Sequence, residues 1–530
     1  MKNRAVCYHL MRGALLVVLA ASPAHAYTLL LEQQSGSIVR LRWPANAQPI
    51  HLQVNNRTVA QLLNVTPDSD PAAAIGRALL HWPAAAAIMF EHSSTPVESA
   101  GSDGVNVITL ADTAANRQAL EMAGGPVGLT LSFFQGADLK EADILFNPAM
   151  RFTTTLDTDG ALSDAMLHDV EAVATHELGH LIGLHHSGVE SASMWAITSV
   201  LQRTLDADDV AGARTLYPVG IPSATIHGAV TVGGAAAFGA HVVAVGASGV
   251  IAASALTLAD GTYAIESIPP DMYTLYVEPL DGPQASVPNV ACVRVGNLSG
   301  AGIYDSAVLT SNFPTTFLAG TDASPPLLLQ AGDSATVNPT LPAGANAINP
   351  TLVGPATVDH GAVSASVSTQ PLRVTAGTDQ WVTLAGPSLD QASGAGVSIV
   401  GPGITVDTSS LIHLTGSCGN DPLPFIVFHA TIDANAPPGG RTIVLRVGTQ
   451  VSAMTGALDV ANPHQSTPCV GDCGGDRMVT VDELLTMVNI ALNTAPVAAC
   501  EAGDSNQDGE ITIDEILTAV NNALGSCPTP

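Results

Sequence analysis

Basic residues are scarce in this chain of 530 residues. Lysine and arginine together number 17 against 46 aspartates and glutamates, which gives a formal net charge of −29. Only two lysines occur, Lys2 and Lys140. Such a chain offers no basic patch that could neutralise phosphates, so the composition argues against a nucleic-acid-binding protein. The acidic excess by itself bears on solubility and says nothing about the fold.

Charge of either sign is also sparse, which excludes a second class of protein. Charged residues make up 12% of the chain and apolar residues 46%. A disordered acidic chain would be poor in apolar residues and dense in charge. Length and composition together therefore predict three or four folded domains.

Long apolar runs are absent after the N-terminal segment. Three basic residues precede the apolar run 14–20, and small residues at Ala24 and Ala26 stand where a signal peptidase reads the chain. The run is shorter than the roughly 20 residues that a membrane anchor needs. The pattern predicts a signal peptide over residues 1–26, cleaved after Ala26. We therefore expect a secreted, extracellular protein with no membrane span after cleavage.

Cysteine usage agrees with export. One of the seven cysteines lies in the predicted signal peptide, and an even number remains, which suggests disulfides. The remaining residues are Cys292, Cys418, Cys469, Cys473, Cys500 and Cys527. Four of them fall in the last 62 residues, where a small module would need cross-links. Four cysteines allow three pairings, and the sequence leaves the choice open.

Residues 27–218 mix strand-like and helix-like segments and predict an α+β domain. A helix should begin at Asp70, with Pro71 in its first position, and end near Trp82. We expect further helices from Leu162 or Asp169 and from Asp206 to Leu216, and strands over 39–43, 50–54, 105–110 and 142–146.

After residue 218 the pattern becomes that of β structure. Residues 222–285 alternate apolar residues with glycine turns, and the segments 260–265 and 273–277 resemble those of the carboxypeptidase-regulatory-like β-sandwich. Residues 286–350 are rich in glycine and proline and are expected to be an extension or a linker. Short β-rich stretches over 351–461 predict an immunoglobulin-like β-sandwich.

Residues 176–186 carry the strongest signal for chemistry, His-Glu-Leu-Gly-His-Leu-Ile-Gly-Leu-His-His. His176 and His180 are four apart and so lie on one helix face. Gly183 can end the helix and turn the chain, so that His186 supplies a third nitrogen. Three neutral imidazoles leave a fourth position for water, which is the catalytic form of a zinc site. Glu177, beside the first ligand, can act on that water as general base.

The alternative is a helix that merely contains histidines, and His185 fits that description because it is not at a ligand spacing. Five fixed identities over 11 residues favour the zinc site. The segment resembles the metzincin clan of zinc endopeptidases. The short spacing to Met194, Ser187 after the third histidine and the segment 205–210 resemble its matrixin branch.

The resemblance spans roughly residues 30–218 and implies a twisted sheet with helices, and a substrate cleft over zinc. It also implies that Met194 supports the floor of the site. Ala196 stands where matrixins usually have proline. No cysteine lies between Ala26 and the zinc ligands, so a cysteine-switch propeptide is not expected.

Near the C-terminus, residues 504–515 match an EF-hand-type calcium loop position by position. The expected ligands are Asp504, Asn506, Asp508, Glu510, Thr512 and Glu515. Residues 472–483 are a degraded copy, in which Asp472, Asp476 and Glu483 remain as ligands of a weaker calcium site. The alternative is a chance turn of Asp, Asn and Gly.

Each loop precedes a similar helical segment, 484–492 and 516–524. Such a duplicated loop and helix resembles a dockerin. The resemblance implies a small all-α calcium-binding module over 466–530 and a cohesin-like scaffold partner. The alternative is a calcium-stabilised cap with no partner.

The sequence thus predicts a multidomain protein, with an α+β metzincin domain followed by β-sandwich modules and a small calcium-loop pair. We expect a secreted endopeptidase that hydrolyses extracellular proteins or peptides with Zn²⁺ and Glu177. The competing hypothesis is a calcium-dependent surface or scaffold-attached binding protein with a vestigial peptidase domain. The intact ligand set and general base count against it.

Overall fold

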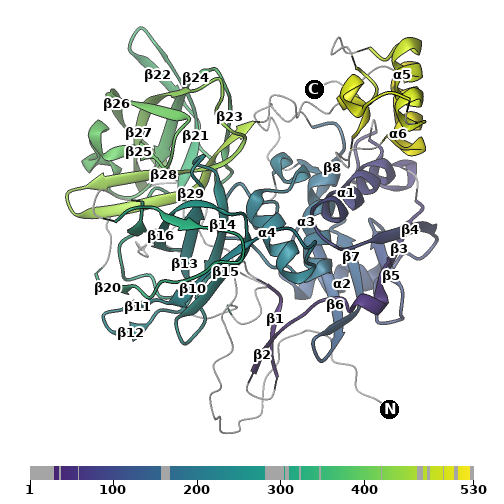
Figure 1. Ribbon diagram of the computed structural model, residues 1–530, viewed down its shortest axis with the longest axis horizontal. Helices are drawn as coiled ribbons and strands as arrows, with labels where there is room; N and C mark the ends of the chain where they lie inside the picture. Colours follow the sequence, from purple (N-terminus) through teal and green to yellow (C-terminus); the bar gives the residue numbers. More distant parts are fainter. Residues whose placement is uncertain are drawn as a thin grey trace. The chain divides into compact units, whose positions relative to one another are not determined.

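The computed structural model describes residues 29–530, except 35–36, 58, 68, 157–166, 198, 281–303, 305–308, 321–323, 345–347, 419–420, 462–468, 474–477, 493, 506–510 and 526–530. The chain forms two compact units (Figure 1). One comprises residues 1–156 and 162–460, and the other comprises 157–161 and 461–530. The predicted signal peptide and the predicted ligands Asp476, Asn506, Asp508 and Glu510 lie outside the described residues.

The N-terminal part of the first unit is built on a five-stranded mixed sheet with the order β4-β3-β5-β7-β6. Four of these strands are parallel, and β6 runs antiparallel to β7 at one edge. The strands are β3 (Ile50–Asn55), β4 (Phe90–Thr95), β5 (Asn106–Thr109), β6 (Gly128–Gln135) and β7 (Asp138–Phe146). Two two-stranded sheets accompany it, made of β1 (Leu31–Gln34) with β2 (Ser37–Arg40) and β8 (Arg151–Thr153) with β9 (Leu167–Asp169).

Helices pack with this sheet and position the site. They are α1 (Pro71–Ala85), α2 (Ala114–Met122), α3 (Val170–Ile182) and α4 (Ala207–Leu216), with short 3-10 helices η1 (Ala45–Ala47), η2 (Val59–Gln61) and η3 (Val200–Arg203). Helix α1 begins as predicted, because the Asp70 side chain accepts a hydrogen bond from the Ala73 N–H. Its fully buried Trp82 donates from Nε1 to the Thr175 carbonyl at 2.9 Å. This bond joins α1 to α3.

The sequence predictions for this part hold for most elements, with shifted ends. Of the two predicted starts of α3, Leu162 and Asp169, the structure has Asp169 as the N-cap, and α4 begins at Asp206 as predicted. The strand predicted over 39–43 ends at Arg40. Neither β6 nor α2 was predicted, and β6 contacts Glu177.

The first β region (residues 224–341) continues the same unit. Its strands are β10 (Ala224–Ala229), β11 (Thr231–Val232), β12 (Ala235–Ala236), β13 (Ala240–Val245), β14 (Ile251–Leu256), β15 (Thr262–Ile268), β16 (Asp271–Pro279), β17 (Thr316–Ala319), β18 (Leu327–Leu329), β19 (Ser334–Thr336) and β20 (Thr340–Leu341). The last four come from the segment expected to be an extension or linker. They pair with β16, β10 and β11, so this segment completes the preceding sheets.

The second β region (residues 348–461) forms a five-stranded and a four-stranded sheet, with the orders β22-β21-β24-β27-β26 and β23-β29-β28-β25. Residues of both sheets, such as Val382, Phe428 and Ile443, share one buried core. The strands are β21 (Leu352–Asp359), β22 (Ala362–Ala365), β23 (Leu372–Thr375), β24 (Asp379–Ala385), β25 (Val397–Ile399), β26 (Ile404–Cys418), β27 (Asp421–Ile432), β28 (Gly439–Val447) and β29 (Gln450–Ala461), with η6 (Leu389–Gln391) and η7 (Gly394–Gly396).

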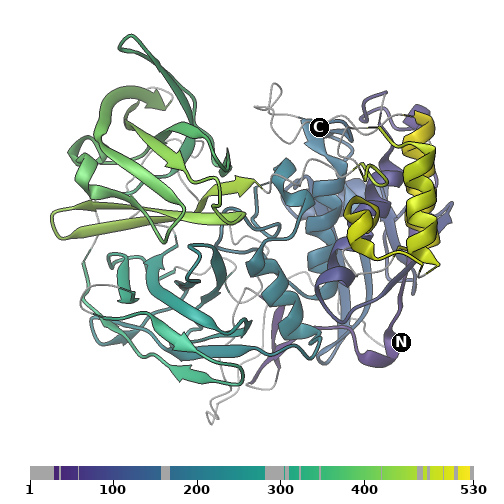
Figure 2. The same ribbon diagram turned by 45° about the horizontal axis from the view of Figure 1, so that its top comes forward.

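The second unit contains α5 (Val481–Ala491) and α6 (Ile513–Gly525), with η8 (Val497–Ala499) and η9 (Glu501–Gly503). The two longer helices lie side by side (yellow in Figures 1 and 2) and pack around Met487, Ile490 and Ala519. A disulfide joins Cys473 to Cys500, and Cys469 is also in a disulfide. No helix among the described residues is long and apolar enough to cross a membrane.

Candidate metal centre and active site

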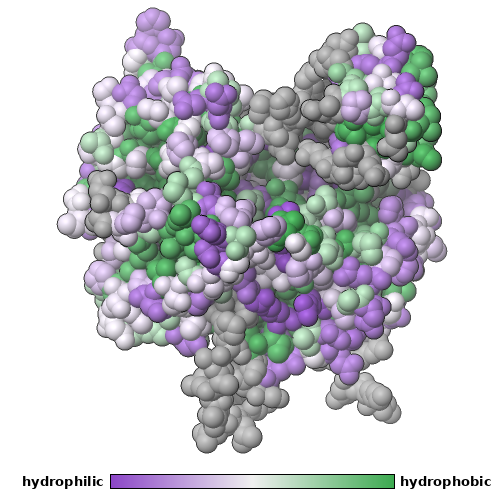
Figure 3. Space-filling model, viewed as in Figure 1, coloured by the Kyte–Doolittle hydropathy of each residue, from purple (hydrophilic) through white to green (hydrophobic). Residues whose placement is uncertain are grey.

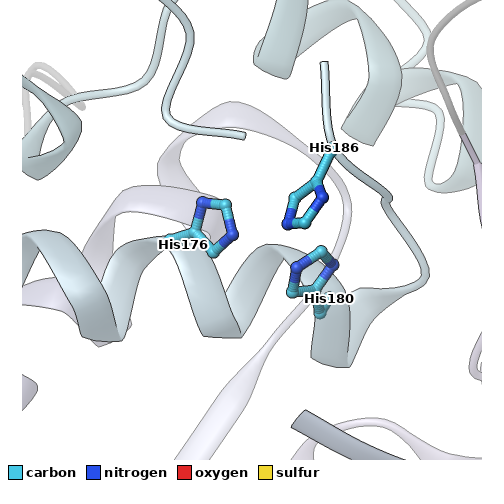
Figure 4. A group of neighbouring side chains, drawn as sticks. All are labelled: His176, His180 and His186. Carbon is cyan, nitrogen blue, oxygen red and sulfur yellow. The ribbon is translucent and has the colours of Figure 1, made fainter. Parts of the chain in front are cut away.

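Three histidines converge at the end of α3. His176 and His180 project from successive turns of this helix, and His186 comes from the chain that follows it (Figure 4). Their candidate ligand atoms all lie within 4.8 Å of one another. One metal ion can therefore be gripped by all three, as the sequence spacing predicts.

The turn after α3 depends on Gly183. This residue caps the helix in the left-handed conformation, with φ 105°, and its N–H bonds the carbonyls of Gly179 and His180. A Cβ atom at this position would lie 2.3 Å from the Leu41 carbonyl oxygen. Both the backbone angle and the close approach require glycine, and the turn brings His186 back over the helix.

The first two histidines are prepared as neutral ligands. Nδ1 of His176 lies 2.7 Å from the Ser193 carbonyl, and Nδ1 of His180 lies 3.0 Å from the Leu184 carbonyl. A carbonyl only accepts, so each Nδ1 carries the proton and each Nε2 keeps its lone pair for a metal. Burial lowers the pKa of His176 to about 3 and that of His180 to about 4. Both rings are therefore neutral at pH 7, which suits zinc.

Glu177 is buried beside this cluster and is held by the edge strand β6. Its Oε2 accepts a hydrogen bond of 2.7 Å from the Thr130 hydroxyl. A Cβ atom at Gly128 would lie 2.5 Å from its Oε1, so glycine there leaves room for the carboxylate. Burial raises the pKa of Glu177 to about 7. The sequence identified Glu177 but gave no sign of Gly128 or Thr130, which lie about 50 residues earlier.

Met194 lies under the helix that carries the first two histidines. A Cβ atom at Gly179 would lie 2.2 Å from the Met194 sulfur, so the thioether packs directly against α3. The Met194 carbonyl accepts from the Ser187 N–H at 2.7 Å, and its own N–H donates to Asp209 at 3.0 Å. The Met194 side chain is buried.

The described part of the predicted calcium loops is closed by hydrogen bonds. Glu515 accepts from the Ser505 N–H at Oε1 and from the Thr512 N–H at Oε2, both at 2.8 Å. Glu483 likewise accepts from the Thr480 N–H at 2.8 Å. Asp472 and Asp504, the first residues of the two predicted loops, are buried. Among the described residues, the three histidines are the one group of three or more His, Cys, Asp and Glu side chains close enough to hold a metal.

Comparison with known proteins finds a family match for this part of the chain. Residues 46–218 match the family described as Matrixin. Metalloendoproteinase 1-MMP of Arabidopsis thaliana is 48% identical over 69 residues, which are 12% of this chain and 18% of that protein. Karilysin of Tannerella forsythia is 45% identical over 49 residues, which are 9% of this chain and 10% of that protein.

The chain thus aligns with less than a fifth of the length of these curated relatives. Among solved structures, the major pilin subunit of Bacillus cereus covers 44% of this chain and 66% of its own, at 9% identity and a TM-score of 0.13. That likeness is too low to say anything about the fold or the function of this chain.

Proposed function

We propose that this chain, whose residues 46–218 form a matrixin zinc metallopeptidase domain, is a working endopeptidase that hydrolyses peptide bonds of extracellular proteins. The observation that carries the proposal is the convergence of His176, His180 and His186 beside the buried Glu177. A vestigial domain would be under no constraint to retain this complete set.

The donor set fits zinc. Three imidazoles are ligands that zinc prefers, and two of them have their tautomer fixed by backbone carbonyls. Zinc held by these three histidines would offer a fourth position to water, lower the pKa of that water to roughly 7 and polarise the scissile carbonyl.

Glu177 performs the proton transfers. Its carboxylate accepts a proton from the attacking water and delivers it to the leaving amine. Burial by itself raises the pKa of Glu177 toward the range in which a general base is most useful. Thr130 fixes the orientation of the carboxylate through Oε2.

The edge strand β6 supports a peptide as substrate. In the described part of the chain β6 pairs with β7 on one side only, so its other edge is open within the sheet. An extended peptide can add to such an edge through its main chain. Because Gly128 and Thr130 of β6 contact Glu177, a peptide on this edge would pass the reacting groups.

The experiment compares the wild-type chain with Glu177→Ala in a casein digestion assay, with and without 1,10-phenanthroline. We expect cleavage by the wild type, its loss with the chelator, and no cleavage by the variant although zinc stays bound. Retained cleavage by Glu177→Ala would refute the assigned general base. An inactive wild type with bound zinc would favour the vestigial domain.

Export is part of the proposal. The disulfide between Cys473 and Cys500 supports it, because such bonds persist in oxidising compartments. The predicted signal peptide points the same way. Sequencing of the N-terminus of secreted protein tests this, and we expect it to begin at Tyr27.

We also propose a dockerin-like role for residues 466–530, with a cohesin-like scaffold as partner and Ca²⁺ in the loops. Apolar residues are exposed at matching positions along α5 with its C-cap and along α6, 32 residues apart, and part of this surface is visible in Figure 3. The matched pairs are Val481 with Ile513, Leu485 with Leu517 and Leu492 with Leu524. Exposed apolar surface of this kind marks interaction sites.

Calorimetric titration with a cohesin module, with and without calcium, tests this role. We expect calcium-dependent binding that Leu485→Asp combined with Leu517→Asp abolishes. Calcium binding without any cohesin binding would support the alternative, a calcium-stabilised C-terminal cap with no partner.

A further inference from the structure

The segment of residues 187–194 connects the third predicted zinc ligand to Met194, and we call it the 187–194 loop. It is buried along its length. Three carboxylates at the start of α4 hold it through short hydrogen bonds. The bonds run from Ser187 Oγ to Asp208 Oδ2 at 2.6 Å, from Ser191 Oγ to Asp206 Oδ2 at 2.8 Å, and from the Ser193 N–H to Asp209 Oδ2 at 2.7 Å.

The first β region reaches the same carboxylates. Ser254, on the edge strand β14, donates to Asp208 Oδ1 from its N–H at 2.6 Å and from its hydroxyl at 3.0 Å. A Cβ atom at Gly188 would lie 2.7 Å from Nε2 of His241, a fully buried residue of β13. Thus β13 contacts the 187–194 loop, and β14 bonds Asp208, which holds the loop.

The second β region contacts the loop from β28 and β29. The Glu190 N–H donates to the Thr455 carbonyl at 2.9 Å. A Cβ atom at Gly440 would lie 2.1 Å from Ser191 Oγ, and one at Gly456 would lie 2.7 Å from the Ser191 N–H nitrogen. The Gly440 N–H also donates to Asp206. These two glycines let the strands approach the loop backbone closely.

The carboxylates need these contacts because they are buried. Burial raises the pKa of Asp208 to about 6 and raises the pKa of Asp206 from its ordinary value. A buried carboxylate that loses hydrogen-bond donors is strongly disfavoured. Each β region donates one backbone N–H to one of them, from Ser254 and from Gly440. Removing either region would take away one of these N–H donors and uncover a carboxylate that bonds the 187–194 loop directly.

We propose that the two β regions are a structural part of the peptidase and fix the 187–194 loop, and with it His186 and Met194. Ser254, Gly440 and Gly456 are then positioning residues for the reaction. The inference rests on the proposed function, and it concerns residues outside the part of the chain that matches the matrixin family.

The test uses Gly440→Ala in the full chain. The added methyl group meets Ser191 Oγ, so either this hydroxyl turns and loses its bond to Asp206 or the loop shifts. We expect zinc affinity, measured by competition with a chelator, to fall on the order of 10-fold, the scale seen when residues that orient metal ligands are lost. We also expect kcat on a casein-derived peptide to fall while KM changes little. Gly344→Ala is the matched control, since a Cβ atom there meets nothing within 4 Å.

A second variant distinguishes an effect that reaches the zinc ligands through the 187–194 loop from a local defect in β28. Ser191→Ala removes the oxygen that the new methyl group meets and leaves a Cβ contact of 3.1 Å. We expect the double variant Ser191→Ala with Gly440→Ala to bind zinc more tightly than Gly440→Ala alone. Equal zinc affinity in Gly440→Ala and the wild type, or no recovery in the double variant, would overturn the inference.

Zinc affinity is measured without hydrolysis, so failure of the proposed function is distinguishable. A wild-type chain that binds zinc but cleaves nothing would refute the peptidase activity. The affinities of the same variants would still decide whether β28 fixes the loop.

Discussion

Thr130 donates a hydrogen bond of 2.7 Å from its hydroxyl to Oε2 of Glu177, and the same hydroxyl lies 3.0 Å from the Glu177 carbonyl. One side chain of the edge strand therefore binds both the backbone and the carboxylate of the proposed general base. The contact lowers the pKa that burial raises, since it stabilises the charged carboxylate.

Replacement of Thr130 by valine should lower kcat by about 10-fold, because it removes a hydrogen bond to a charged group with little change of shape. The pKa of Glu177 should rise. A general base must be deprotonated, so the acidic limb of the pH profile of kcat/KM should move to higher pH. Thr130→Ser keeps the hydroxyl and should resemble the wild type. An unchanged pH profile in Thr130→Val would contradict the assigned role.

Gly128→Ala should displace the same carboxylate without removing its partner. The new Cβ atom would lie 2.5 Å from Glu177 Oε1, which is closer than any normal contact. We expect kcat to fall by at least 10-fold with zinc still bound, as measured by steady-state kinetics and metal analysis. Gly101→Ala is the control, since its Cβ atom meets nothing within 4 Å. Full activity of Gly128→Ala would show that the carboxylate has room to move.

Gly76→Ala should stabilise the peptidase region. Gly76 lies inside α1, and a Cβ atom there meets nothing within 4 Å. Alanine in a helix interior is favoured over glycine by about 0.5–1 kcal/mol. The measurement is the free energy of unfolding in urea. Gly104→Ala is the control. A Cβ atom there also meets nothing within 4 Å, but Gly104 has φ 86°, so alanine should destabilise the protein. A loss of stability in Gly76→Ala would indicate strain in α1.

Asp143 should make stability depend on pH. The side chain is fully buried in β7, and burial raises its pKa from 3.8 to about 7, although it accepts from the N–H groups of Gly101 and Val107. The folded state therefore binds a proton between about pH 4 and pH 7 that the unfolded state has released. The free energy of unfolding should fall as pH rises through this window, by up to about 1.4 kcal/mol per pH unit.

Urea unfolding of the wild type and Asp143→Asn at several pH values checks this. The variant should lack this component of the slope between pH 4 and pH 7. It should also be less stable at low pH, because an amide cannot accept from both N–H groups as well as the carboxyl group does. Parallel curves for the two proteins would contradict a raised pKa for Asp143.

The parts of the site that are local in sequence could be predicted. The spacing of His176, His180 and Gly183 determines the helix face and the turn, because helix geometry and glycine conformation act over a few residues. Asp70, Asp169 and Asp206 likewise indicate where helices begin.

Contacts between distant segments could not be predicted. Nothing in the sequence near Gly128 indicates that this strand packs on Glu177, because the pairing of β6 with β7 decides it. The strands β17–β20 are two to four residues long, too short to show a period of two among glycines and prolines. Asp206 and Asp208 lie at the start of a predicted helix, and their partners in the β regions lie 46 residues or more away.

The hydrogen bond from Ser254 to Asp208 limits where the chain can be truncated or fused to another protein. The compact unit does not divide at residue 218, where the family match ends, but runs on to residue 460. A recombinant fragment that stops at residue 218 would expose the apolar and acidic surface that β14 and β28 now cover. An expression boundary, or a fusion joint in a chimeric enzyme, belongs after residue 460, where the first compact unit ends.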